Sequence, residues 1–184
     1  MKSGLSVRID KAQSILDALK TLANKDVLVG IPESKDERDD SESEIGNAAI
    51  GYINENGSPA QNIPPRPHLK PGVKSVEQDY LPHLKAAAQK ALEGNAVGAE
   101  TSLERAGTVA ANGVKRFITA SGFTPLAEST LADRARRGRV GAAKELASRA
   151  AGYAPNNANA KPLIDTGEYR RSITHVVRDK DADT

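Results

Sequence analysis

One stretch of the sequence has residue types in an order that could carry out catalytic chemistry. Asp165, Thr166 and Gly167 follow the apolar pair Leu163 and Ile164, which would present a carboxylate in a tight turn. Two such carboxylates that share one proton can activate a water molecule, because adjacent like charges cannot both ionise. The sequence holds this triplet once, so the chemistry would require a dimer.

The triplet resembles the active-site turn of aspartic proteases, but the residues around it favour a structural role. Residues 168–171 are Glu-Tyr-Arg-Arg, which places charge where those enzymes keep small side chains, and no glycine-rich flap is evident. We expect Asp165 or Thr166 to cap a short helix that carries Tyr169 and Arg170. A dimeric protease is kept as an alternative function.

A second candidate is a cluster of four arginines within six residues, formed by Arg134, Arg136, Arg137 and Arg139. Such a cluster can neutralise phosphates without sequence preference. No aromatic residue is interleaved to stack on bases, which disfavours single-strand recognition. Three interpretations stay open: a solvated helix end whose cations complement the helix dipole, a surface for an acidic protein partner, and a small basic nucleic-acid-binding protein.

The sequence indicates no metal, cofactor or nucleotide site. It has no Cys, and its three histidines, His68, His83 and His175, lack the paired spacing that a metal site needs. No glycine-rich loop of the phosphate-binding kind occurs. We therefore expect no cofactor, and we expect each histidine to lie at the surface or to be partly buried.

The elements that must position these residues follow from hydrophobic periodicity. Helices are expected over residues 11–23, 45–56, 76–92, 103–120, 126–137 and 140–150. Strands are expected over residues 5–9, 27–31 and 173–177. Because strands occur near both termini, the sequence predicts an α+β fold in which a small mixed or antiparallel sheet joins the two ends of one domain, residues 1–184, and packs with several amphipathic helices.

Several residues are expected to set the ends of these helices. Ser75 followed by Gln78 has the spacing of a capping box, and Thr124 followed by Pro125 is a strong helix start. Gly57 is placed to end the helix that precedes it. These signals predict where the central helices begin and end.

Three segments are expected to lie outside the regular elements. Residues 33–44 hold seven acidic and two basic residues and no apolar one, which predicts a flexible acidic loop. Residues 57–72 hold five prolines and are expected to form a stiff arm, extended over residues 63–69. The arm could bind an SH3-like module, but docking on its own fold or on a neighbouring subunit fits better, because apolar residues flank the prolines. Residues 179–184 are expected to fray.

Composition favours a subunit that is stabilised by partners. Only 3% of the residues are aromatic and 38% are hydrophobic, so the core must be built from Ala, Leu, Ile and Val. Charge is segregated: residues 105–149 hold nine basic and three acidic residues, opposite in sign to the acidic segment. No apolar run is long enough to cross a membrane and no signal peptide is evident, so we expect an intracellular chain without a membrane partner.

Three blocks of the sequence together resemble the neck and tail-completion proteins of tailed bacteriophages. In that family a helix ending in Glu-x-Gly precedes Ile-Pro-x-Arg-Pro-Phe-Leu-Arg-Pro, as residues 48–57 and 63–71 do here. Residues 125–131 fit the stretch that runs into basic residues, and residues 162–174 match Leu-x-Asp-Thr-Gly-x-Leu-x-x-Ser-Ile. The chain departs from the pattern at His68, where Phe is usual, at Tyr169, where Leu is usual, and in its acidic segment 33–44.

The resemblance implies a structural virion protein without catalytic activity. Such proteins are assembled in the host cytoplasm and form a homo-oligomeric ring at the head–tail junction, between the head-side connector or adaptor and the tail terminator. Genomic DNA passes through the ring without sequence recognition. We expect a hexamer, with a dodecamer as the alternative.

Two groups of residues are expected at interfaces with neighbouring subunits or other virion proteins. They are the arm residues Ile63, Pro64, Pro65, Arg66, Pro67 and Leu69, and the arginines Arg134, Arg136, Arg137 and Arg139. The arginine cluster is expected to face protein rather than to dominate the DNA channel. The turn Asp165-Thr166-Gly167 would set Tyr169 and Ile173 into the core beside a strand.

Overall fold

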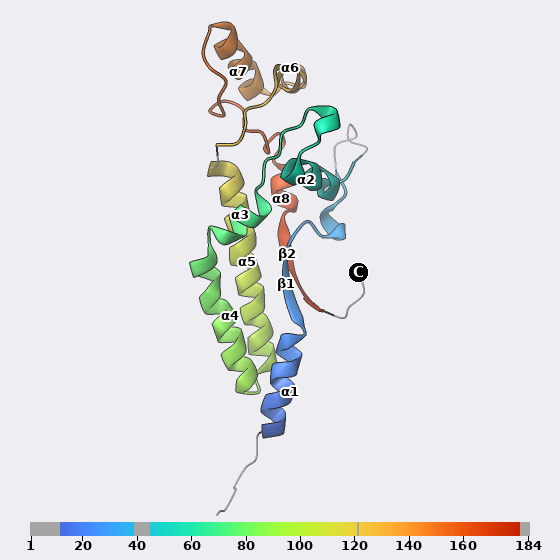
Figure 1. The fold of residues 1–184 in the computed structure, drawn as a ribbon, viewed down its shortest axis with the longest axis vertical. Coiled ribbons are helices and arrows are strands. Elements are labelled where there is room, and N and C mark those ends of the chain that lie inside the picture. The colour runs from blue at the N-terminus through green and yellow to red at the C-terminus, as the bar shows by residue number, and fades with distance from the viewer. Residues whose placement is uncertain (1–11, 39–44, 121, 181–184) are drawn as a thin grey trace, which may run out of the picture.

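Two long helices form the axis of the molecule. The structure is a computed structural model that describes residues 12–38, 45–120 and 122–180. In it, α4 (Glu77–Leu92) and α5 (Ala96–Ala120) run side by side, and α5 also contacts the sheet on its other side. The helix α1 lies at one end of the molecule, and α6 and α7 lie at the opposite end (Figure 1). The bounds of the remaining helices are α1 (Ala12–Ala23), α2 (Asn47–Asn56), α3 (Leu69–Lys74), α6 (Glu128–Arg136), α7 (Val140–Ala150) and α8 (Glu168–Ser172).

The sheet consists of one strand from each end of the chain. β1 (Lys25–Gly30) pairs antiparallel with β2 (Thr174–Asp179), in a register that runs from Lys25 opposite Asp179 to Gly30 opposite Thr174. The expected α+β fold with a small sheet from strands near both termini is confirmed. The expected strand at residues 5–9 lies outside the described residues.

The end of the chain departs from the expected frayed tail. Asp179 belongs to β2, and the N–H of Lys180 donates to the carbonyl of Asn24. These two residues are therefore held by the backbone of the opposite terminus, and only residues 181–184 of the expected tail lie outside the described part.

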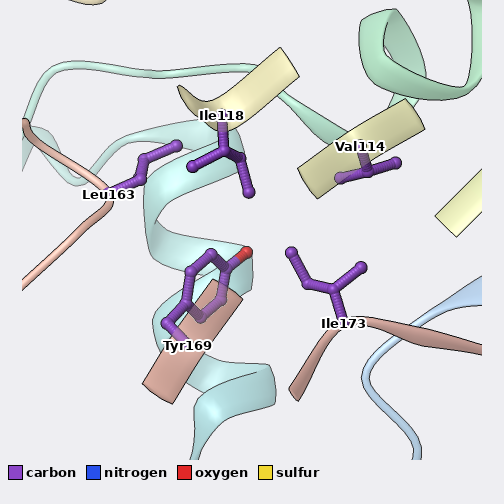
Figure 2. Packing of buried hydrophobic residues seen from close by; sticks show 5 residues of the cluster. All are labelled: Val114, Ile118, Leu163, Tyr169 and Ile173. Atoms are coloured by element: carbon purple, nitrogen blue, oxygen red, sulfur yellow. The ribbon is translucent and has the colours of Figure 1, made fainter. Parts of the chain in front are cut away.

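The main core is built where α5 meets the C-terminal segment. Val114 and Ile118 of α5 pack with Leu163, Tyr169 and Ile173, and their side chains turn toward a common centre (Figure 2). Small residues let the helices approach closely: a Cβ added at Gly72 of α3 would lie 2.7 Å from the Cα of Val114. A second apolar cluster, formed by Leu126, Leu131, Ala142 and Ala160, joins α6, α7 and the loop that follows them.

The predicted start of the helix over residues 126–137 is wrong by two residues. α6 begins at Glu128, after an extended Ala127, instead of at residue 126. The carbonyl of Thr124 accepts the Nε–H of Arg66, and the carbonyl of Leu126 accepts the Nη1–H of Arg149. Because tertiary hydrogen bonds use these backbone acceptors, the chain stays extended past Pro125.

The predicted capping box and the end of the proline arm also need correction. Ser75 ends α3, and its hydroxyl donates to the carbonyl of Gly72 instead of capping α4. The arm has no helix or strand over residues 64–68, His68 is not extended (φ −140°, ψ −27°), and Leu69 begins α3. Pro71 fits there because the first-turn N–H groups of a helix have no partner within it.

The first part of the acidic segment is ordered by its polar groups. Glu33–Lys35 form a 3-10 turn, and the carboxylate of Asp36 accepts the N–H of Ala48 at 2.6 Å in the first turn of α2. Arg38 donates to the side-chain oxygen of the buried Asn47. Residues 33–38 of the expected flexible loop thus contain a 3-10 turn and polar groups bonded within the fold, and residues 39–44 lie outside the described part.

No helix in the described part of the chain combines the length and apolar character that crossing a bilayer requires.

Candidate functional site

The sequence blocks that were singled out separately meet at one place in the structure. The arm contacts the segment before α6 through Arg66, whose Nε–H donates to the carbonyl of Thr124 at 3.2 Å. The arm also contacts α8 through His68, which is hydrogen bonded to Tyr169. α6 contacts residues 161–165 through Arg134. These bonds join three parts of the chain that are far apart in sequence.

Residues of the arm alternate between the interior and solvent. Arg66 and His68 are buried. Pro65, which precedes Arg66, and Pro67, which lies between the two, are exposed. Successive side chains of an extended backbone point to opposite sides, which explains the alternation. Leu69 packs against the main core. Of the expected arm contacts, Arg66 and Leu69 are therefore used inside this chain, and Pro65 and Pro67 are free to meet a partner.

Arg134 is a buried clamp on the segment that precedes the Asp-Thr-Gly turn. Its Nη1 donates to the carbonyls of Lys161 and Ile164, and its Nη2 donates to the carbonyl of Pro162, each at 2.9 Å. Only 9% of the residue is exposed. This role could not be read from the residue types, because an arginine in a basic run has the same pattern whether it is solvated or buried.

Asp165 is the counter-ion of the arginine cluster. Its carboxylate lies 2.9 Å from Nη1 of Arg137 and 3.0 Å from Nε of Arg139, and Nε of Arg134 is 3.9 Å away. Three of the four clustered arginines are thus turned toward one carboxylate of the same chain. The fourth, Arg136, is exposed and pairs with Asp133.

The turn itself is closed by the two residues that follow Asp165. The N-cap residue of α8 is Gly167 rather than Asp165 or Thr166, and Oγ1 of Thr166, one residue before it, accepts the N–H of Glu168 at 3.1 Å. Asp165 makes no such bond. Gly167 has φ 81°, a left-handed conformation that favours glycine, and α8 begins directly after it. Tyr169 and Ile173 are carried into the core.

His68, Tyr169 and Glu55 form a buried polar network inside this site. His68 is fully buried, so the expectation of a surface or partly buried histidine is wrong for this residue. Its Nδ1 lies 2.8 Å from the carbonyl of Arg66 and 3.0 Å from a carboxylate oxygen of Glu55. The same carboxylate accepts the N–H groups of His68 and Leu69 and so caps α3.

Burial shifts the pKa values of two members of this network, His68 and Tyr169. It lowers the pKa of His68, against the opposing effects of the hydrogen bond to Arg66 and the charge of Glu55. Burial also raises the pKa of Tyr169, and the negative charge of Glu55 adds to that rise. A neutral ring satisfies both partners if Nδ1–H donates to the carbonyl of Arg66 and Nε2 accepts the hydroxyl proton of Tyr169.

A pocket of about 630 Å³ opens between these elements. Its walls come from α2, the arm, the segment before α6, α6 itself and the turn before α8. Seven of the residues singled out from the sequence line it: Ile63, Pro64, Arg66, Arg134, Asp165, Thr166 and Gly167. Arg136 and Arg137 do not line it, and Arg139 lines a separate, smaller hollow beside α7.

The described residues hold no group of three His, Asp or Glu side chains that could bind a metal ion. No protein-family model matches the chain, and neither a curated protein nor a solved structure is similar to it.

Proposed function

We propose that the chain is a structural subunit of a tailed-phage virion that forms a homo-oligomeric ring at the head–tail junction. In this role it joins the head-side connector to the tail terminator, surrounds the genomic DNA and has no catalytic activity. A hexamer is the preferred assembly. The proposal starts from the resemblance of three sequence blocks to neck and tail-completion proteins.

One observation carries the proposal: the three blocks that resemble the family form one packed unit. The arm bonds to the segment before α6 through Arg66 and Thr124, and it bonds to the C-terminal block through His68 and Tyr169. Arg134, just after the second block, holds the start of the third. Chance matches to a family pattern would have no reason to meet in space, whereas a shared structural unit requires it.

The surface of the single chain also suits assembly. α1 is strongly amphipathic, yet none of its residues is buried, and Leu16 and Leu19 are 51% and 41% exposed. On the outer face of the sheet, the paired residues Leu28 and Val176 are 42% and 40% exposed. A two-stranded sheet is marginal alone and gains stability from further contacts. Neighbouring copies in a ring would cover these apolar residues through heterologous interfaces.

The geometry of Asp165 does not favour the protease alternative. A proton-sharing pair of carboxylates needs a second acid beside the first. The groups around Asp165 are instead the guanidinium groups of Arg134, Arg137 and Arg139. The same contacts engage most of the arginine cluster within the chain, and Arg136, which does not contact Asp165, is an exposed member that nucleic acid or protein could meet.

Native mass spectrometry of the purified chain tests the assembly. The expected result is a closed species of six copies, with twelve as the alternative, and ring-shaped particles by negative-stain electron microscopy. Leu16→Glu should reduce the ring population without unfolding the subunit, because Leu16 is half exposed in the single chain. The exposed Val140 on α7 offers a matched control, Val140→Glu. A chain that remains monomeric at all concentrations argues against the proposal.

A further inference from the structure

The pocket of about 630 Å³ is lined by more positive than negative groups. Three of its charged lining residues are positive, namely Arg38, Arg66 and Arg134, and one, Asp165, is negative. Asp165 is already shared with Arg137 and Arg139. Arg38 is paired with Glu168 at 3.5 Å, and Arg134 faces Asp165, so Arg66 is the lining arginine that has no carboxylate among the described residues.

Arg66 is the least compensated of these groups. It is 7% exposed, and its Nε donates to the carbonyl of Thr124. Within residues 12–38, 45–120 and 122–180, no carboxylate lies within ion-pair distance of Arg66, and its Nη1 and Nη2 have no acceptor. Burial lowers the pKa of the Arg66 guanidinium, which reflects the cost of keeping the charge there. A guanidinium does not give up its proton under ordinary conditions, so the buried charge persists.

Arg134 differs from Arg66 although both line the pocket. The Nη groups of Arg134 donate to three carbonyls, and its Nε faces Asp165 at 3.9 Å. The two guanidinium groups are close enough for the charge of Arg66 to disfavour the charged form of Arg134. Nη1 and Nη2 of Arg66 are not among the fully buried polar atoms that lack a partner, so both donor groups are open to the pocket and can donate to an anion there.

The start of α6 adds to the positive potential. Ala127 precedes the helix without a side-chain cap, and Ser129 and Thr130 of its first turn line the same pocket. The first N–H groups of a helix have no partner within it and attract negative charge. The start of α6 lines the same pocket as Arg66, whose Nη1 and Nη2 have no acceptor among the described residues.

We propose that this pocket binds an oxyanion, a phosphate or a carboxylate group, that accepts paired hydrogen bonds from Nη1 and Nη2 of Arg66 and lies against the first turn of α6. The planar fork of an arginine matches both kinds of oxyanion. The volume is that of a site for a small ligand or for one anionic group of a larger one. This site does not depend on the ring assembly and can be tested on the free chain.

Thermal unfolding at constant ionic strength tests the site. We expect Tm to rise in phosphate or in acetate relative to chloride, by about 5–10 °C at an anion concentration a hundred times Kd. A rise of Tm in phosphate alone indicates a phosphate site, and a rise in acetate alone indicates a carboxylate site. Arg66→Gln should abolish the rise, and Arg136→Gln, which removes an exposed arginine of the same cluster, should retain it.

A second variant keeps the test sharp if Arg66→Gln does not fold. Ser129 is exposed at the mouth of the pocket, so Ser129→Asp should fold and supply a carboxylate from the chain itself. We expect a higher Tm in chloride than the wild type and no further rise in phosphate or acetate. A wild-type Tm that is the same in all three anions, or a rise that is equal in wild type and Ser129→Asp, overturns the proposal.

Discussion

The ring nitrogen Nε2 of His68 is hydrogen bonded to the hydroxyl of Tyr169, 101 residues away in the sequence. The two rings meet edge to face, with centroids 5.6 Å apart. These are the two positions at which the chain departs from the neck-protein pattern, where Phe and Leu are usual. Under the proposed function, this polar pair would stand where the pattern has two apolar residues.

The first prediction concerns this hydrogen bond. Tyr169→Phe removes the hydroxyl and leaves Nε2 of the fully buried His68 without its partner. We expect a loss of about 1–3 kcal/mol in the free energy of unfolding, measured in urea, because a buried group loses its hydrogen bond. Tyr52→Phe is the matched control, since Tyr52 is 72% exposed and should tolerate the change.

The double variant His68→Phe with Tyr169→Leu restores the usual residues of the pattern. We expect its loss of stability to be smaller than the sum of the two single losses by about 0.5–3 kcal/mol, because neighbours that share a bond are not additive. Strict additivity would mean that the two residues are not coupled.

The second prediction is a dependence of stability on pH that originates at His68. Burial lowers the pKa of His68 below its ordinary value of 6.5, so the unfolded chain binds a proton at higher pH than the folded chain does. Stability should therefore be full above pH 6.5 and fall as the pH decreases below it, until the folded-state pKa is reached. Urea unfolding at pH 7.5, 6.5 and 5.5, run on wild type and His68→Phe, measures the effect. The slope should be smaller in the variant, and equal slopes contradict the assignment.

The third prediction concerns the clamp formed by Arg134. Arg134→Lys keeps the charge but cannot reach the carbonyls of Lys161, Pro162 and Ile164 together. We expect a loss of about 2–4 kcal/mol, because buried acceptors lose charge-assisted hydrogen bonds. Arg136→Lys, at an exposed site on the same helix, should change stability by less than about 0.5 kcal/mol. Similar losses of stability in both variants would show that the buried hydrogen bonds of Arg134 do not contribute to stability.

The fourth prediction separates the counter-ion role of Asp165 from a catalytic role. Asp165→Asn leaves Arg137 and Arg139 without their carboxylate and should lower stability by about 1–2 kcal/mol, a modest value because the carboxylate is partly solvated. No peptide hydrolysis should be lost, since we expect none in the wild type. Pepstatin-sensitive cleavage by the wild type that Asp165→Asn abolishes would instead support the protease alternative.

Much of the fold follows from the sequence where one face of an element is apolar. α1, α4 and both strands lie close to their expected ranges because periodic apolar residues mark them directly, whereas α5 begins at Ala96, seven residues before its expected start. The beginning of α6 could not be predicted, because the carbonyls of Thr124 and Leu126 accept hydrogen bonds from arginines that are distant in sequence. α3 was missed because a proline usually signals extended chain, although Pro71 is tolerated in a first turn.

The candidate site was predictable in its parts and not in its arrangement. The Asp-Thr-Gly turn, its helix and the place of Tyr169 in the core follow from local pattern. The burial of His68 and Arg66 and the convergence of the arginines on Asp165 depend on contacts between distant segments. Residue type and spacing do not predict such contacts, and the type of a charged residue does not predict which partner it will contact.

The central claim is that this chain is a structural part of a phage particle at the head–tail junction. Cryo-electron microscopy of particles produced from the genome that encodes it measures this most directly. The account predicts a ring of six copies between connector and tail terminator, with the elongated α4–α5 pair recognisable in each copy. Mature particles that lack the chain altogether would contradict it.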